Sequence, residues 1–403
     1  QAMATKDDDS DGLLAENDDA PPTNAALFWE VLGLAVPTAL GNALEYLPVT
    51  FALIIIGQID DKDSETGGMA LSAVTLARSF FNATAMAPSF GLMSALRALC
   101  PQAVGAGKPE LCALYIQRAC VLILLAAPPL CAAQFYSARF LVALGQEPRV
   151  AAMAQQYCVR LIPQYFGIAF MTCLQRVFQA HGFMTQNMLV CGVVCLIAPA
   201  IQWVCVHTFG GGWLGAAWAA GVFNGCYVLL QVPYLLRAGM GYLFIVQRES
   251  ISLAGMREYV LLAMPGFLQS VLEWWVLELV ILLTGGLRDC DSCLAASGVF
   301  GNIQAVFIMG WIGLLVAASV SVGRYIGAGN PSTARRAALA VSAVALASGG
   351  VAAILIGIFR HEVARLYTRD SELAELAASL LVVLAVVVVL VSLRVRTHAC
   401  EPS

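Results

Sequence analysis

Of the 26 acidic residues in this sequence, only Glu45, Glu273 and Glu278 lie deep within long apolar stretches. If those stretches cross a bilayer, each charged carboxylate costs about 3 kcal/mol there, and acids at such positions commonly mark an ion or proton path. A carboxyl group in that setting is a plausible proton acceptor, although an acid with a purely structural hydrogen bond fits the same pattern. On a helix, Glu278 points about 140° away from Glu273, so the two cannot face one point. Glu278 is therefore the weaker candidate, and Glu273 and Glu45 are the first ones because they occupy equivalent positions in the internal repeat described below.

Aromatic residues flank two of these acids in the sequence. Trp274 and Trp275 directly follow Glu273, and Tyr46 directly follows Glu45. Aromatic rings beside a carboxylate suit an organic cation, which gains cation–π attraction as well as apolar contact. Ordinary packing, or a belt of aromatics at a membrane interface, is the competing interpretation. We predict that these three aromatic residues contact a cationic ligand.

Two further polar residues stand in an apolar stretch. Asn82, in the segment SFFNAT, can hydrogen-bond a protonated glutamate or bind an ion, and an interhelical amide bond explains it equally well. Arg78 lies one helical turn earlier, where it either pairs with an acid or extends to an interface. The GAGKP and GAGNP segments have no strand before them and no G-K-[ST] after them, so they indicate helix-terminating turns rather than phosphate loops.

No cofactor or metal site is readable in the sequence. The four histidines are scattered, and Cys290 and Cys293 form a single C-x-x-C without a second pair. Most of the 13 cysteines lie in apolar stretches, where a thiol behaves as a small hydrophobe rather than as part of a disulfide framework. No nucleophile–base pair or nucleotide-binding loop is recognisable either. We therefore expect no cofactor, no metal and no enzyme activity.

Composition identifies the class of protein: 60% of the 403 residues are hydrophobic and 12% are charged. A soluble domain has about 45–50% apolar and about 25% charged residues, so a soluble enzyme and a disordered protein are excluded. A nucleic-acid binder is excluded because no basic face is present. A backbone that crosses a bilayer must satisfy its own hydrogen bonds, so we predict an all-α integral membrane protein. Ten windows are long enough to span, near residues 26–57, 69–96, 112–133, 157–175, 188–209, 213–236, 256–284, 294–320, 337–359 and 376–393.

An internal repeat relates the two halves of the chain. AVPTALGNALEY (residues 35–46) matches AMPGFLQSVLEW (residues 263–274), so Glu45 and Glu273 occupy equivalent positions. GLMSALRALCPQAVGAGKP (residues 91–109) likewise matches GLLVAASVSVGRYIGAGNP (residues 313–331). Six spans, an even number, separate the members of each pair, so the halves have the same topology. Two like helix bundles with a cavity between them are typical of an alternating-access transporter.

The repeat and the charges divide and orient the chain. We expect an acidic, disordered tail (residues 1–25), a first six-helix bundle (residues 26–248) and a second bundle with four visible helices (residues 249–403). Lys and Arg are more frequent in the loops on the side of the N-terminus, which places that side in the cytoplasm. Arg176 counts among these loop residues, because the fourth apolar window ends at residue 175.

Three segments resemble a known family: GLMSALRALCPQAVGAGKPELCALYIQRA, VLEWWVLELVILLTG and VSVGRYIGAGNPSTARRAA. They are similar to the multidrug and toxic compound extrusion (MATE) family in its eukaryotic form, from about residue 27 to about residue 345. The resemblance implies two six-helix bundles that exchange a proton or a sodium ion for an organic cation, mostly a proton in eukaryotic members. It also implies that Glu273 matches the family's essential glutamate, and that Glu278 and Asn82 match positions that the family uses.

The sequence also departs from that family. The family has twelve spans and about ten are visible here, the last of them a valine-rich run, so we expect a chain truncated at its C-terminal end. Pro101 and Arg97 stand where a glycine and an acid are usual, and Gln58 stands where histidine is common. These departures bear on gating and ion choice more than on the fold.

The leading hypothesis is a proton-coupled antiporter that exports organic cations, xenobiotics or related metabolites by alternating access. In this hypothesis the substrate exchanges for protons bound at Glu273, and Glu45 tunes the site. We expect it to act as a monomer in the plasma membrane or in a vacuolar or other organelle membrane, and to bind no nucleic acid. The alternative within transport is a flippase of the same superfamily for a lipid-linked substrate. That activity would favour a cationic cavity, and Arg78 is the only residue in the sequence that supports one. The alternative outside transport is a truncated remnant that moves nothing.

Overall fold

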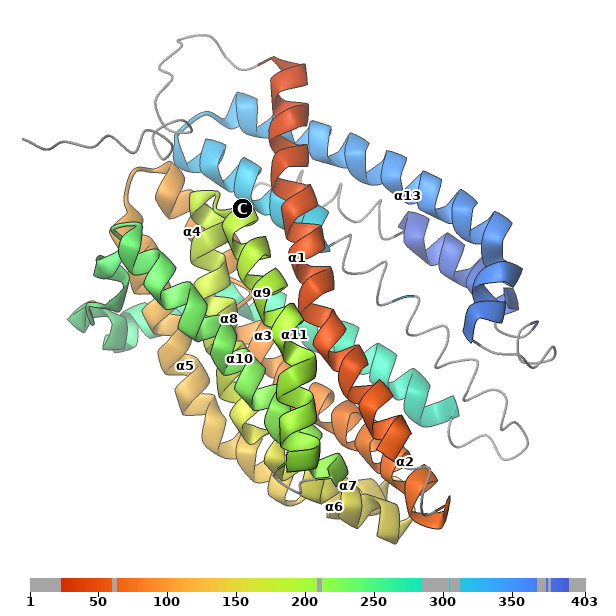
Figure 1. Cartoon of the computed structure of the whole chain (residues 1–403). Helices are drawn as coiled ribbons and strands as arrows, with labels where there is room; N and C mark the ends of the chain where they lie inside the picture. Colours follow the sequence, from red (N-terminus) through yellow and green to blue (C-terminus); the bar gives the residue numbers. More distant parts are fainter. Residues whose placement is uncertain are drawn as a thin grey trace, which may run out of the picture.

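The computed structural model describes residues 23–59, 64–208, 212–284, 304, 312–367, 375 and 378–390. Within these residues every regular element is a helix, which confirms the predicted fold class (Figure 1). Of the tail expected over residues 1–25, the part up to residue 22 lies outside the described residues, as does the Cys290–Cys293 motif.

The first half of the chain supplies most of the described helices. In order they are α1 (Asn24–Ile59), α2 (Ser64–Phe81), α3 (Ala87–Leu92), α4 (Leu96–Gly105), α5 (Pro109–Phe135), α6 (Ser137–Ala143), α7 (Pro148–Arg160), α8 (Ile162–His181), α9 (Met184–Trp203) and α10 (Gly212–Arg237). Two wider π-helical segments, η2 (Asn82–Met86) and η3 (Val204–Thr208), directly follow α2 and α9. The short 3-10 helices η4 (Gly241–Phe244) and η5 (Arg248–Ile251) lead into the second half.

The second half contributes α11 (Leu253–Thr284) and α13 (Pro331–Tyr367). Two shorter apolar helices also belong to it, Ile312–Gly327 and Ala378–Leu390, and we call the first of them helix 312–327. The N-terminal part of α1 packs into this half, because Val31 and Leu34 share a buried apolar cluster with residues of helix 312–327, α13 and Ala378–Leu390. In Figure 1, α1 accordingly runs between the helices of the first half and α13. Helix α1 therefore joins the two halves.

The two repeat-related loops end their helices in the same way. Gly107 has φ 68° and Gly329 has φ 73°, a left-handed conformation that glycine adopts without strain. The Lys108 N–H donates to the Ala103 carbonyl at 2.9 Å, and the Asn330 N–H donates to the Tyr325 carbonyl at the same distance. This is the Schellman arrangement, which satisfies carbonyls at a helix C-terminus. The prediction that GAGKP and GAGNP are helix-terminating turns is confirmed.

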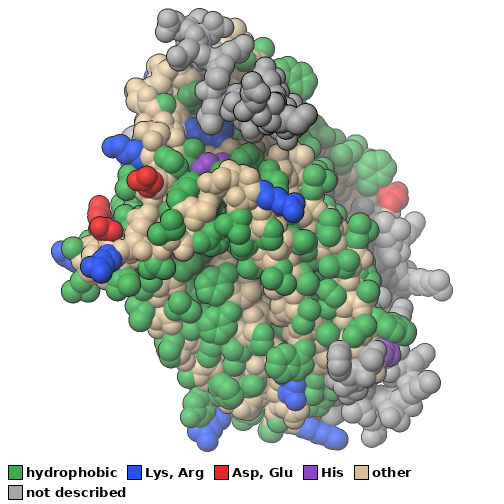
Figure 2. All heavy atoms as spheres, turned by 60° about the vertical axis from the view of Figure 1, so that its left-hand side comes forward, with side chains coloured by type: hydrophobic (Ala, Val, Ile, Leu, Met, Phe, Trp, Pro, Cys, Tyr) green, Lys and Arg blue, Asp and Glu red, His purple; other side chains and the backbone are tan. Residues whose placement is uncertain are grey.

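Some of the described helices are long and apolar enough to cross a bilayer. Five of them could cross one by length and composition, and six if the bent pair Pro148–Arg160 and Ile162–His181 forms one span. Large apolar side chains such as Leu196 and Leu229 are exposed on their outer faces. Figure 2 shows hydrophobic side chains over the middle of one face, with charged side chains toward its two ends. The number of ten spans stays a prediction. The windows near residues 69–96 and 256–284 are not among these candidate spans, and those near residues 294–320 and 376–393 are described only in part.

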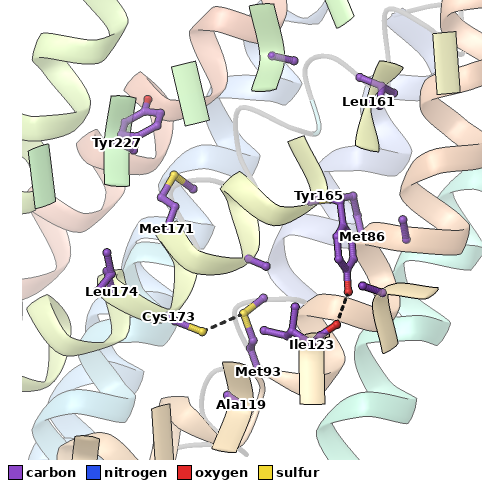
Figure 3. Close-up of a cluster of buried hydrophobic side chains, with 14 of the residues drawn as sticks. Met86, Met93, Ala119, Ile123, Leu161, Tyr165, Met171, Cys173, Leu174 and Tyr227 are labelled. Atoms are coloured by element: carbon purple, nitrogen blue, oxygen red, sulfur yellow. Dashed lines mark hydrogen bonds between the residues drawn. The ribbon is translucent and has the colours of Figure 1, made fainter. Parts of the chain in front are cut away.

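The interior of the first half is close-packed around a few polar anchors. Tyr165 is buried, and its hydroxyl donates to the Ile123 carbonyl of α5 at 3.0 Å (Figure 3). The Cys173 thiol of α8 donates to the Met93 sulfur at 3.7 Å in the same cluster. These contacts hold α5 and α8 against the segment that follows α3, and so fix the wall on which the polar site is built.

The loop after α4 offers a direct test of orientation. We expect a membrane-impermeant maleimide to label Lys108→Cys only from the cytoplasmic side, because Lys108 lies with the excess of basic loops. Glu147→Cys, at the start of α7 and at the other end of α5, is the matched residue for the opposite side. Mass spectrometry of each labelled peptide separates these sites from the native cysteines. Labelling of Lys108→Cys by reagent added outside intact cells would overturn the orientation.

Candidate ion and substrate site

A buried polar contact between the two halves joins Glu278 of α11 to Asn82 of η2. The Asn82 amide Nδ2 donates to Glu278 Oε1 at 3.1 Å. Glu278 is only 8% exposed, and its second oxygen, Oε2, is buried without a hydrogen-bond partner. A buried carboxyl oxygen with a spare lone pair is able to receive a proton. The acid that the sequence ranked lowest therefore has the best-defined environment of the three.

The π-helical segment η2 shapes the Asn82 side of this contact. A π-helix is a rare local widening that is frequent at functional sites, and Asn82 is its first residue. The segment also presents a backbone carbonyl to the second half, because Trp275 Nε1 donates to the Ala83 oxygen at 3.0 Å. Asn82 and Trp275 thus bind across the same junction from opposite sides.

The two tryptophans pack against the first half of the chain. The Trp274 ring stacks on Phe90 of α3, with centroids 5.6 Å apart and planes inclined by 23°. Trp275 remains 47% exposed despite its hydrogen bond to Ala83. Packing is therefore part of the role of both residues. Contact of Trp274, Trp275 and Tyr46 with a cation stays a prediction.

Glu273 has different surroundings from Glu278. Its carboxyl group is exposed, and Gln269 Nε2 donates to its Oε1 at 3.5 Å, one turn earlier on α11. The helical phase of α11 predicted that the two acids face different environments, and the structure confirms it. Glu273 is accessible to a ligand, whereas Glu278 is enclosed between α11 and η2.

Glu45 forms a second polar group with α8. Gln175 Nε2 donates to Glu45 Oε2 at 2.8 Å, and the guanidinium of Arg176 lies close enough to interact electrostatically with the same carboxyl group. Arg176 also donates from Nη1 to Gln179 Oε1 at 2.6 Å. The placement of Arg176 in a loop was wrong: α8 continues to His181 and ends only at Gly182, which has φ 84°. Its guanidinium consequently lies on a helix, within electrostatic range of Glu45, rather than in a loop.

Arg78 lies within electrostatic range of the Glu278 carboxyl group. Its charge acts on the Glu278 carboxyl group and on the hydroxyl of the buried Tyr157. Ser79, the next residue, is buried beside the same carboxyl group. The two roles that the sequence left open for Arg78, pairing with an acid and extension to an interface, stay predictions.

Several polar partners in this region were missed from the sequence. Gln134 of α5 donates to the Thr84 hydroxyl of η2 at 2.9 Å, and Gln231 of α10 donates to the Asn187 amide oxygen of α9 at 3.0 Å. Glutamine and asparagine within apolar windows were the available signal, because a buried amide in a membrane helix commonly binds another helix. Which helix each one would reach could not be read from the sequence.

Comparison with known proteins identifies the family. The family model MatE matches residues 37–204 and 265–396, on both sides of the repeat junction. This chain belongs to the MatE family. The MatE assignment confirms the resemblance of the sequence motifs and, with the apolar helices, a multi-pass integral membrane protein.

Plant proteins are among the relatives of this MatE chain. Protein DETOXIFICATION 36 of Arabidopsis thaliana is 27% identical over 330 residues, which cover 80% of this chain and 64% of that protein. Protein DETOXIFICATION 8 of the same plant is 28% identical over 356 residues, which cover 85% and 69%. The chain thus spans about two thirds of the length of these relatives.

Solved structures of MATE proteins have the same fold. The crystal structure of the eukaryotic MATE transporter AtDTX14 aligns with a TM-score of 0.85 at 25% identity, covering 93% of this chain and 82% of that one. A MATE crystal structure described as in the straight conformation aligns with a TM-score of 0.77 at 20% identity, over the same shares of the two chains. The second likeness extends to the fold alone.

Proposed function

We propose that this chain is a proton-coupled antiporter that exports organic cations, xenobiotics or related metabolites by alternating access. Membership of the MatE family and the similarity to a eukaryotic MATE transporter support a transport activity. The names of the plant relatives, which refer to detoxification, support export of foreign or toxic compounds. The internal repeat supports two bundles, residues 26–248 and 249–403, that move relative to each other.

The hydrogen bond between Asn82 and Glu278 is the observation that carries the coupling proposal. It links the first half to the second through a buried acid. A hydrogen bond to a charged carboxylate is roughly twice as strong as one between neutral groups. Uptake of a proton by Glu278 would therefore weaken the attachment of α11 to η2, and its release would restore it. Protonation and the relative position of the halves are linked in this way.

The substrate would bind beside the coupling acid. Exposed Glu273 offers a negative charge, and Trp274, Trp275 and Tyr46 offer aromatic faces, which together suit an organic cation. Glu45, held by Gln175 and next to Arg176, would tune the site from the first half.

The flippase alternative receives no support from the geometry. That activity would favour a cationic cavity for a lipid-linked head group, but Arg78 acts on Glu278 and so stands near a negative partner. We accordingly propose a monomer in the plasma membrane or an organelle membrane, with a small cation and a proton as its partners.

Ion gradients imposed on proteoliposomes test the coupling. We expect vesicles that hold the full chain, and are acidic inside, to accumulate a fluorescent organic cation without sodium, because each outgoing proton exchanges for substrate. A protonophore should abolish accumulation, and protein-free liposomes are the control. Uptake that requires a sodium gradient and ignores the pH gradient would exclude proton coupling. No uptake under either gradient would favour the non-transporting remnant.

A further inference from the structure

The two halves approach each other closely where a pair of repeat-related glycines lies. Gly105 ends α4, and Gly327 occupies the equivalent position at the end of helix 312–327. A Cβ atom on Gly105 would collide with the Arg324 backbone, and one on Gly327 would collide with the Gln102 backbone. Because Gln102 and Arg324 are also equivalent in the repeat, the two contacts are copies of each other. Only glycine permits this backbone-to-backbone approach.

The side chain of Arg324 reaches beyond this crossing into the first half. Its Nε and Nη2 both donate to the Ala180 carbonyl, at 3.1 Å and 2.9 Å, in the last turn of α8. Cationic side chains are favourable at a helix C-terminus, where carbonyls lack helical partners. A Cβ on Gly182 would lie 2.7 Å from Arg324 Nη2, so the left-handed glycine after α8 also leaves room for the guanidinium.

Two further residues of the second half, Tyr325 and Arg336, bind the start of α1 with three hydrogen bonds. The Tyr325 hydroxyl donates to Glu30 Oε2 at 2.8 Å. Arg336 of α13 donates from Nε and Nη2 to Asn24 Oδ1, at 3.0 Å and 2.8 Å.

The repeat is asymmetric at Arg324, because the first-half counterpart of Arg324 is Gln102, which carries no charge. The second half alone supplies the cationic arm.

We propose that the crossing of α4 with helix 312–327 is a gate that closes this end of the molecule, and that Arg324 is its latch. The role as a gate rests on the proposed transport by alternating access. To open, the helices must separate at Gly105 and Gly327, and Arg324 must leave the Ala180 carbonyl. The gate lies on the side of the membrane at which the Lys108 loop emerges.

A cysteine introduced at a buried position of the same helix can report the opening of the gate. Ser321 is fully buried and lies one helical turn before Arg324 on the same helix, so Ser321→Cys should react slowly. The protein is reconstituted in liposomes, and an impermeant maleimide is added to the side from which Lys108→Cys reacts. Mass spectrometry of the peptide that carries position 321 gives its rate. We expect Arg324→Met to raise that rate about tenfold, since a hydrogen bond to a charged group contributes that much or more to an equilibrium.

The glycine variants test the backbone contact independently. Gly105→Ala and Gly327→Ala should each raise labelling at position 321, because the methyl group forces the helices apart. Gly33→Ala in α1 is the matched control, since its new methyl group would meet no atom within 4 Å. Arg324→Lys keeps the charge but has only a single donor nitrogen, so an intermediate rate is expected.

The outcomes separate the gate from the transport proposal. The proposed role of Arg324 as the latch would be overturned if Arg324→Met leaves the labelling rate of Ser321→Cys unchanged. The protein must elute as a single monodisperse species in this comparison. If Arg324→Met fails to fold, the rate in Arg324→Lys decides in the same way. If the labelling rates respond as expected but the chain transports no substrate, the proposed function is refuted and the closure of this end by the gate is still supported. Proton-driven transport with unresponsive labelling would refute the gate alone.

Discussion

Glu278→Gln should reduce pH-driven uptake of an organic cation to background while the protein still inserts and folds. Glutamine keeps the shape of the side chain and can still accept the Asn82 hydrogen bond, but it cannot take up or release a proton. A neutral amide is also cheaper to bury than a carboxylate, so stability should be retained or increased. Uptake into proteoliposomes, normalised to the amount of monodisperse protein, is the measurement.

A matched substitution on the same helix controls for non-specific effects. Glu258→Gln changes an exposed acid of α11 in the identical way, and uptake should stay at the level of the unmodified protein. Glu273→Gln should retain coupling and mainly weaken binding of the cation, and Glu45→Gln should have a smaller effect. Background uptake in Glu273→Gln together with normal uptake in Glu278→Gln would transfer the proton site to Glu273. Normal uptake in both variants would leave these acids with a structural role only.

Gly91→Val is expected to lower the thermal stability of the protein more than a comparable change elsewhere. A Cβ on Gly91 of α3 would lie 2.7 Å from the Phe267 ring and 2.9 Å from its Cα, so α11 would have to move. The same junction is held by the Tyr259 hydroxyl, which donates to the Leu92 carbonyl at 3.1 Å. Overpacking of a close contact costs about 1–3 kcal/mol. We therefore expect a lower Tm and a larger aggregated fraction, followed by light scattering during heating.

Gly33→Val provides the control for Gly91→Val. Gly33 also lies within a helix, but its side chain would meet nothing within 4 Å. Valine there should leave Tm unchanged or raise it slightly, because glycine is the poorer helix former. An equal loss of Tm in both variants would show that helix propensity, rather than the α3–α11 contact, determines the effect.

The sequence predicted the architecture better than the contacts between its parts. Two related halves and their helix-terminating turns could be predicted from matching residues around Pro37 and Pro265 and in the GAGKP and GAGNP segments. They also place Gly91 and Gly313 at equivalent positions. The repeat did not reveal that Gly91 would approach Phe267 in the other half. Nor did it reveal that Gly313 would approach Ala39, which is the repeat-equivalent of Phe267. A repeat pattern describes each half by itself, and contacts between halves depend on how the bundles dock.

The ranking of the acids shows the same limit. Helical phase separated Glu273 from Glu278, yet hydropathy could not tell which of them would be enclosed. The answer depends on Asn82, almost two hundred residues away, and on the local widening of its helix. Arg176 was misplaced because its apolar window ended one residue earlier, whereas the helix ends at a glycine. A hydropathy window reports the average polarity of a segment. It does not show where a single charged residue is buried against a specific partner.

The π-helix after α2 makes the length of this segment as important as its composition. One residue advances an α-helix by about 100°. The wider π-helical turn accommodates one additional residue. It therefore rotates the side chains that follow it around the helix axis relative to the side chains that precede it. Loss of one residue between Asn82 and Met86 would restore a regular helix and rotate Phe90 away from the direction it shares with Asn82. Relatives that lack this residue would have to rebuild the junction with α11 from other side chains, even with every polar residue of the site retained.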